Sequence, residues 1–391
     1  MNLPASDVLE INQQAHELLK AERWAEAEQL LQPVLASGVG PIALWRQLFY
    51  AVRPQGKVAQ AQQILELIVQ TVPSDIAARF DLAEILLLEG DFTRGWRQYR
   101  FRYQLDHTVV MARHVQKPRW EGQAIHGKTL LIHDEQGFGD TFQFLRMVAS
   151  AQTRSGARII LEVNEESYAL AQRSAGFDEI IQRGSIPPPF DLHCELMSLP
   201  LAMGLQLSDL PGKLPYLSAN PQRVEKWRKC LADLPRPLVG LVWAGRPTHT
   251  NDVRRSMTLN DLAPLAQTGI SFVALQKGPA SAQAATPPAG MSLLSLSDEI
   301  HDFEDTAAIC MLLDTLISVD SSPVHLSGAL GCPVWVMLPF MPDWCWLLGR
   351  NDTPWYANTR LFRQPADVQW QPVLQALAAE LLKLKESFKD A

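Results

Sequence analysis

Hydrophobic positions recur every 34 residues over the first hundred residues of the chain. Three sets of positions share this spacing: Trp24, Val58 and Phe92; Ala27, Ala61 and Gly95; and Leu31, Leu65 and Tyr99. A turn precedes each repeat, and the small residue of the second set lets the two helices of a pair approach closely. The pattern predicts an all-α domain of three helical hairpins, which we place at residues 1–107.

A period of 34 residues with small and bulky side chains at fixed offsets is typical of the tetratricopeptide repeat, or TPR. An ordinary helical bundle whose spacing matches by chance is the alternative, and the nine positions in register disfavour it. Three repeats are close to the smallest array that can bury a shared face. We therefore expect the repeats to lean also on the domain that follows.

From Lys128 onward, apolar runs of strand length alternate with helical segments. The expected strands are 129–133, 158–163, 179–182 and 190–194, and then 238–243, 270–276, 315–319 and 333–338. Such alternation predicts parallel sheets with helices on both faces. We expect two Rossmann-like lobes, residues 108–217 and 218–391, with a cleft at the carboxyl ends of their strands. A final helix, 371–388, is expected to pack back on the first lobe.

Composition and charge mainly exclude classes of protein. The net charge is −7 and no basic cluster stands out, which disfavours a dedicated nucleic-acid binder. The first residues lack the pattern of a signal peptide, and no apolar run reaches the ~18 residues of a membrane span. The five cysteines form no CxxC pair. We therefore expect reduced thiols, a cytoplasmic location and no transmembrane segment.

A glycine-containing turn, Glu135–Thr141, joins the first expected strand to a helix. Its candidate ligand contacts are Gln136, Gly137 and Gly139. Glycines let the backbone approach a ligand, and the helix that follows offers free N–H groups. Asp140 lies at about the N-cap, so it either caps the helix or faces the cleft as a base for an acceptor hydroxyl. The dinucleotide fingerprint is absent, because GxGxxG requires glycine where Phe142 stands.

A second turn between strand and helix begins the segment Val319–Gly331. Its candidate contacts with a nucleotide diphosphate are Asp320, Ser321, Ser322 and His325. Hydroxyl groups at a helix N-terminus form a plausible diphosphate cradle, and Pro323 suits the first helical turn. For His325, a buried structural histidine is the alternative.

A third group of candidates lies at the ends of two strands of the second lobe. It consists of Trp243, Arg246, Arg255 and Lys277. Guanidinium groups can clamp phosphate bidentately, and the ammonium adds a cation to the same rim. Solvated surface charges are the alternative. The chain has no DxD pair of carboxylates of the kind that binds Mg²⁺ together with a diphosphate.

Asp320–Gly331 resembles the D-[ST]-x-x-x-H-L-x-x-A-L-G segment of the ADP-heptose:lipopolysaccharide heptosyltransferases, which belong to glycosyltransferase family 9. Gly139 and Asp140 resemble the family's amino-terminal Gly-Asp, whose carboxylate is the proposed base. The closer similarity is to TPR-containing bacterial members, and it covers about residues 118–365. The segments that carry it are Trp120–Gly122, Glu135–Asp140, Gly240–Gly245, Arg255–Ser256, Leu275–Lys277, Asp302–Thr306, Asp343–Trp344 and Pro354–Tyr356.

This resemblance implies a GT-B fold of two Rossmann-like lobes, preceded here by the TPR domain. It further implies an inverting, metal-independent hexosyl- or heptosyltransferase that needs no cofactor and takes a nucleotide-diphosphate sugar as substrate. Asp140 would be the catalytic base. The expected partners are the sugar donor and a protein or glycan acceptor, which the TPR domain would bind. Homo-oligomerisation stays open.

Two positions depart from the family pattern. Cys345 stands where an Asp-Trp-Arg-Trp segment has arginine, and Ser322 stands where other members have glycine. Loss of a cation near the donor would change donor choice or weaken catalysis. A non-catalytic adaptor built from TPR and GT-B parts is therefore the alternative function. A dinucleotide-dependent Rossmann enzyme is a weaker third option, because its fingerprint is absent.

Overall fold

A computed structural model describes residues 5–36, 40–105, 115–210, 212, 214–249 and 251–389. The chain forms two compact units. The first comprises Met1–Ala112 together with Phe340–Leu348, and the second comprises Arg113–Pro339 together with Gly349–Ala391. We call them the helical unit and the α/β unit. The predicted boundary between residues 107 and 108 lies outside the described residues.

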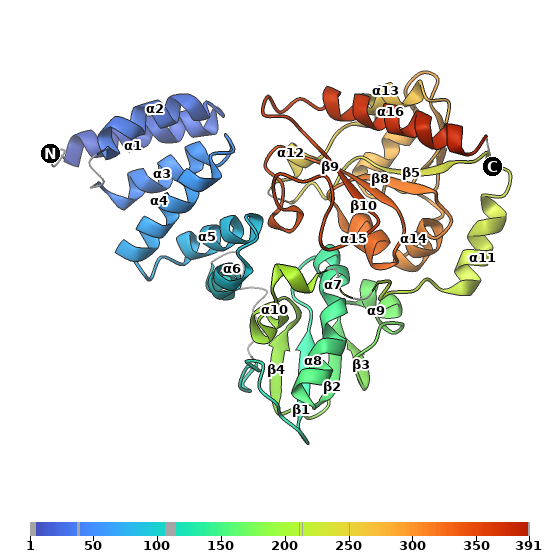
Figure 1. Cartoon of the computed structure of the whole chain (residues 1–391), viewed down its shortest axis with the longest axis horizontal. Helices are drawn as coiled ribbons and strands as arrows, with labels where there is room; N and C mark the ends of the chain where they lie inside the picture. Colours follow the sequence, from blue (N-terminus) through green and yellow to red (C-terminus); the bar gives the residue numbers. More distant parts are fainter. Residues whose placement is uncertain are drawn as a thin grey trace. The chain divides into compact units, whose positions relative to one another are not determined.

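The helical unit consists of consecutive helices that pack as pairs. They are α1 (Ala5–Lys20), α2 (Trp24–Leu35), α3 (Ile42–Val52), α4 (Val58–Thr71), α5 (Ile76–Leu88) and α6 (Phe92–Tyr99), followed by a 3₁₀ turn at Arg100–Gln104 (Figure 1). The second helix of each pair begins at the position predicted from the 34-residue period. The turns repeat as well, since Glu22, Gly56 and Gly90 all have positive φ angles. The three predicted hairpins are confirmed.

Small residues allow the two helices of a hairpin to touch. Ala27, Ala61 and Gly95 occupy the predicted positions, and Ala27 and Ala61 are fully buried. A Cβ atom built on Gly95 would lie 2.7 Å from Leu87 Cδ2, closer than two carbon atoms can pack. Glycine at this position therefore sets the spacing of α5 and α6.

The segment Phe340–Leu348 belongs to the helical unit although it follows a strand of the α/β unit. The Trp344 ring packs edge-on against Trp96, with centroids 5.3 Å apart, and lies 6.1 Å from the Tyr99 ring. A Cβ atom on Gly56 would meet the Phe340 ring at 2.6 Å. The predicted carboxyl-terminal lobe is therefore not one continuous piece of the fold. Cys345 is buried in this segment.

The α/β unit contains two parallel sheets. The first, the N-lobe sheet, has the order β3-β2-β1-β4, with β1 at Thr129–His133, β2 at Arg158–Val163, β3 at Glu179–Gln182 and β4 at Leu192–Glu195. Its strands β1 and β2 are almost wholly buried apolar runs, as expected of a parallel sheet covered on both faces. All four strands were predicted, with the fourth shifted by one or two residues.

The second sheet, the C-lobe sheet, has the order β10-β9-β8-β5-β6-β7, which is the strand order of a six-stranded Rossmann sheet. Its strands are β5 (Leu238–Val242), β6 (Ser271–Ala274), β7 (Ser292–Ser295), β8 (Thr315–Val319), β9 (Val334–Leu338) and β10 (Thr359–Arg363). The edge strands β7 and β10 were not predicted from the sequence. In both sheets the order reverses beside the first strand, between β1 and β4 and between β5 and β8.

Helices connect and cover these strands. They are α7 (Phe138–Phe144), α8 (Val148–Ser155), α9 (Glu165–Ala171), α10 (Leu199–Met203), α11 (Pro221–Cys230), α12 (Asp252–Arg255), α13 (Ala263–Ala266), α14 (Phe303–Cys310), α15 (Ser322–Ala329) and α16 (Gln371–Ser387). The helical segment expected after the Glu135–Thr141 turn is divided by a 3₁₀ turn at Leu145–Met147. None of the helices in the described part of the chain has the length and apolarity to cross a bilayer.

The expectation that the last helix packs back on the first lobe is wrong. The buried face of α16 includes Leu374, Leu377 and Leu381, which join the hydrophobic core of the C-lobe sheet. The Nζ of Lys385 donates to the carbonyl of Thr268 at 2.9 Å and to that of Gly269 at 2.9 Å. Apolar residues at helical spacing thus find their partners in the lobe that precedes them, beside α13 (Figure 1).

We predict that Trp344→Ala lowers the free energy of unfolding of the helical unit by roughly 3–5 kcal/mol, because truncation of a buried Trp leaves a cavity beside Trp96. Hydrogen exchange should accelerate in α5 and α6 but not in β5 and β8. Trp370→Ala is the matched control, since Trp370 packs against the C-lobe core. Equal exchange in α5 and α6 of the variant and the parent chain would show that Phe340–Leu348 does not stabilise the helical unit.

Candidate functional site

The N-termini of α7 and α15 meet within the α/β unit, where the two helices lie side by side (Figure 1). A Cβ atom built on Gly139 would lie 2.9 Å from His325 Cδ2 and 3.6 Å from the Cα of Ser322. Glycine is therefore required for this close approach. Two motifs almost two hundred residues apart in the sequence, Glu135–Thr141 and Val319–Gly331, form one site.

Asp140 is the third residue of α7, and Gly137 is the N-cap, so the predicted position at about the N-cap is corrected by three residues. Its Oδ2 accepts a hydrogen bond from the Gly137 N–H at 3.0 Å. The capping role is thus real, and the same carboxylate lies in the field of His325 and Asp320. Burial raises the pKa of Asp140 above that of an ordinary aspartate, His325 lowers it, and Asp320 raises it further.

His325 is buried and held from two sides. Its Nδ1 lies 3.0 Å from the Tyr356 hydroxyl oxygen, and its Nε2 lies 3.8 Å from Asp320 Oδ1. The Tyr356 ring packs directly on the backbone of Gly328, where a Cβ atom would come within 2.5 Å. These contacts favour the structural interpretation of His325. Its position against Gly139 nevertheless places the ring beside Asp140.

The turn after β8 lies where the strand order reverses, which is where open α/β sheets bind ligands. Asp320 is buried at this point. The Ser321 hydroxyl donates to the Val319 carbonyl at 3.1 Å, so it faces the sheet and the predicted phosphate contact through it is not supported. Ser322 begins α15 and is half-buried.

Two candidates of the third group have structural roles. Trp243 is fully buried in the C-lobe core, and its Nε1 donates to Gln283 Oε1 at 3.1 Å. The ring is therefore part of the core, and this burial does not support the predicted contact between Trp243 and the donor. The Lys277 Nζ donates to the carbonyls of Ser297 at 2.6 Å and Ile300 at 2.8 Å. This ammonium therefore anchors a loop, and two of its three N–H groups are used.

The other two candidates remain near the site. Arg246 is exposed, whereas Arg255 is mostly buried and pairs with Asp252, with Nε and Oδ1 3.2 Å apart. His249, which sequence analysis missed, belongs with them. Partial burial lowers the pKa of His249, Arg255 lowers it further, and the charge of Asp320 raises it. Asp320 therefore links the loop after β5 electrostatically to Asp140. A histidine between the two arginines, just past β5, was the available signal.

Gly245 explains why this loop is compact. A Cβ atom there would lie 2.5 Å from Asp252 Oδ1 and 2.6 Å from the Nη2 of Arg255. Its N–H donates to the Ser256 hydroxyl at 2.8 Å. The loop is thus folded over the Arg255 guanidinium.

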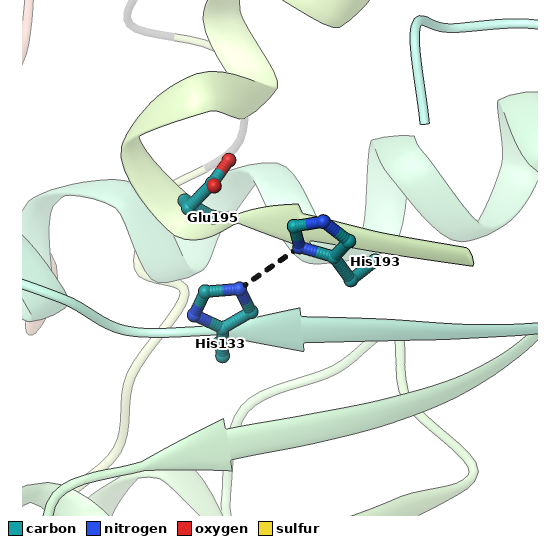
Figure 2. Close-up of side chains that lie close together, drawn as sticks. All are labelled: His133, His193 and Glu195. Atoms are coloured by element: carbon teal, nitrogen blue, oxygen red, sulfur yellow. Dashed lines mark hydrogen bonds between the residues drawn. The ribbon is translucent and has the colours of Figure 1, made fainter. Parts of the chain in front are cut away.

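A second polar cluster, also missed from sequence, lies at the equivalent position of the N-lobe sheet. His133 ends β1, and His193 and Glu195 lie on β4 (Figure 2). All three are buried, and one potential ligand atom from each lies within 4.8 Å of the others. Imidazoles and a carboxylate so grouped are the kind of residues that hold a metal ion.

Comparisons with known proteins give partial likenesses. No protein-family model matches the chain. The chain is 27% identical to Protein FlbA of Caulobacter vibrioides over 339 residues, which are 79% of this chain and 56% of FlbA. The chain thus spans about half the length of this curated relative.

Similar solved structures include a family 9 glycosyltransferase of Veillonella parvula, with 11% identity, a TM-score of 0.49, and coverage of 67% of this chain and 99% of that one. The ADP-heptose lipopolysaccharide heptosyltransferase II of E. coli has 15% identity and a TM-score of 0.46, with coverage of 66% and 99%.

We predict opposite pH shifts for two variants around Asp140. If its ionised carboxylate is the reactive form, kcat/KM falls as the pH drops through its pKa. His325→Asn removes a charge that lowers this pKa, so the acid limb should move to higher pH; Asp320→Asn should move it to lower pH. The measurement is the pH profile of donor-sugar turnover. Shifts of the same sign would exclude Asp140 as the titrating group.

Proposed function

We propose that the protein is a glycosyltransferase that moves a sugar from a nucleotide-diphosphate donor to a hydroxyl acceptor. The observation that carries the proposal is the packing of Gly139 on His325, because it places Asp140 beside the carboxyl ends of β5 and β8 in the C-lobe sheet. A carboxylate of raised pKa and an anion-binding edge are the two parts that such a transfer needs. The similar solved structures named above are glycosyltransferases, but the assignment here rests on these residues.

The donor diphosphate would lie at the C-lobe edge. The N-terminus of α15 directs the positive end of its dipole there, and Arg255, Arg246 and His249 lie in the loop that follows β5. Fixed dipoles and cations can stabilise the departing nucleoside diphosphate without a metal ion. Of the predicted contacts, Ser322 and Arg255 are retained in this proposal, and Trp243, Lys277 and the Ser321 hydroxyl are withdrawn.

Asp140 would accept the proton of the acceptor hydroxyl. The acceptor oxygen forms a bond to the anomeric carbon as the bond from that carbon to the diphosphate breaks, and attack from the opposite face inverts the configuration. Burial raises the pKa of Asp140 and so increases its basicity, while His325 lowers that pKa. Its bond to the Gly137 N–H fixes the direction of the carboxylate.

Replacement of Asp140 tests the proposal. Asp140→Asn should lower transfer, or donor hydrolysis without acceptor, by ~10²–10⁴ while nucleotide affinity by calorimetry stays within a few fold. Asp261→Asn is the matched control, because Asp261 also caps a helical turn through its Oδ2, at 2.8 Å from the Thr258 N–H, and is exposed.

Near-normal turnover by the purified Asp140→Asn protein would leave only the capping role. Nucleotide binding without any turnover by the parent chain would instead favour the adaptor function.

The helical unit would be a TPR domain that binds the acceptor, a protein. Arg46, Tyr50 and Arg53 share one face of α3, and the two arginines pair with Asp75 and Glu84 near α5. Tyr50 is 41% exposed on this face. An exposed Tyr between arginines has the composition of a binding hot spot.

Tyr50→Ala should therefore weaken modification of the natural protein acceptor at least several fold, with donor hydrolysis unchanged. Leu9→Ala, which removes an exposed side chain from α1, is the control. Full modification by the Tyr50→Ala protein would exclude this face. Deleting residues 1–105 is a poorer test, because it would remove the helices that form one compact unit with Phe340–Leu348.

A further inference from the structure

The parallel pairing of β1 and β4 brings His133, His193 and Glu195 onto one face of the N-lobe sheet. His133 pairs directly with Glu195, and Leu131 pairs with His193. Paired residues of neighbouring strands point to the same face, and residues two apart on a strand do so as well. The three side chains therefore lie on one face at the carboxyl end of the sheet, and Figure 2 shows the two imidazole rings facing each other with Glu195 beside them.

The distances suit one shared ion. His133 Nε2 and His193 Nδ1 lie 3.2 Å apart. Two nitrogen ligands of a tetrahedral zinc ion, each at about 2.0–2.1 Å from it, lie about 3.4 Å apart. The two rings also stack at 20° with centroids 5.5 Å apart, which keeps the two nitrogens close together on one face of the sheet.

The carboxylate is already oriented by a neighbour. Arg119 donates to Glu195 Oε1 at 2.5 Å. Ligand carboxylates and histidines of metal sites are commonly held by such outer hydrogen bonds. The backbone reinforces the arrangement, because Arg119 forms a parallel bridge with His193 and Trp120 N–H donates to the His193 carbonyl at 2.8 Å.

We propose that His133, His193 and Glu195 bind a divalent first-row transition metal ion, with zinc or ferrous iron as the fitting class. Two imidazoles and one carboxylate match the softness of these ions, whereas magnesium and calcium favour oxygen ligands alone. The site lies in the N-lobe, apart from the C-lobe edge proposed for the diphosphate. A bound ion would tie the end of β1 to β4 and so fix the start of Glu135–Thr141.

A hydrogen-bonded histidine pair without metal is the competing state. In that state one imidazole donates to the other, and the cluster binds no ion. The two states differ in stoichiometry of metal, in the spectrum of a bound cobalt ion and in stability with added zinc. None of these readouts depends on sugar transfer, so they test the metal site independently of the proposed function.

The test uses the full chain, freed of metal by a chelator and dialysed against Zn²⁺. The parent chain should retain stoichiometric zinc by mass spectrometry and gain thermal stability from it. His193→Gln should lose the bound zinc, and Glu195→Gln should weaken its binding by at least the roughly 10- to 100-fold that loss of an outer-shell partner costs. His16→Gln, an exposed histidine on α1, is the matched control and should bind as the parent does.

Absence of stoichiometric binding by the parent chain with Zn²⁺ and also with Fe²⁺ would overturn the proposal, as would full zinc retention by His193→Gln. If that variant does not fold, the visible spectrum of the parent chain loaded with Co²⁺ distinguishes the two states. Intense visible bands of a cobalt ion with nitrogen ligands support the site, and the weak spectrum of hydrated cobalt contradicts it.

Discussion

The close packing of α7 on α15 is the contact on which the candidate site depends. It is possible only because Gly139 has no side chain where His325 and the start of α15 press against it. Surrounding contacts hold the two lobes in this arrangement. The Phe303 ring packs against Phe138 and Phe142, each at 5.0 Å between centroids, and the Arg146 Nη1 donates to the Trp355 carbonyl at 2.7 Å. Asp140 is thereby brought within the electrostatic field of groups from the other lobe.

The charged groups around Asp140 determine what this geometry can do chemically. Burial raises the pKa of Asp140 and His325 lowers it, burial and Arg255 lower the pKa of His249, and the charge of Asp320 raises both pKa values. A carboxylate under such competing influences can be poised for proton transfer in a way that an exposed capping aspartate cannot. The hydrogen bond from Gly137 fixes its direction, so capping and chemistry are compatible uses of one side chain.

Local signals in the sequence were enough for the repeats and most strands. β1, β2, β3 and β8 have the predicted bounds, because each is a short apolar run or lies in an uninterrupted strand-helix alternation. The edge strands β7 and β10 escaped notice, since Ser292–Ser295 is short and half-exposed and Thr359–Arg363 alternates with charged residues. Asp140, Asp320 and His325 were singled out because a glycine- or serine-containing turn follows a strand in both segments, and the structure packs Gly139 against His325.

Features that depend on strand pairing or packing in three dimensions could not be predicted from the sequence. Trp243 was misread because a bulky residue at a strand end can fill the core as readily as a cleft. The His133, His193 and Glu195 cluster arises from strand pairing, and no spacing in the sequence reveals it. Nor did any pattern assign Phe340–Leu348 to the helical unit.

A structure of the protein with a bound nucleoside diphosphate, tried with ADP, UDP and GDP, tests the central claim most directly. The account predicts that the diphosphate lies at the N-terminus of α15, within reach of the Ser322 N–H and Arg255, and that the adjoining space opens toward Asp140. A nucleotide bound at the N-lobe edge, or with its diphosphate pointing away from Asp140, would contradict the assignment.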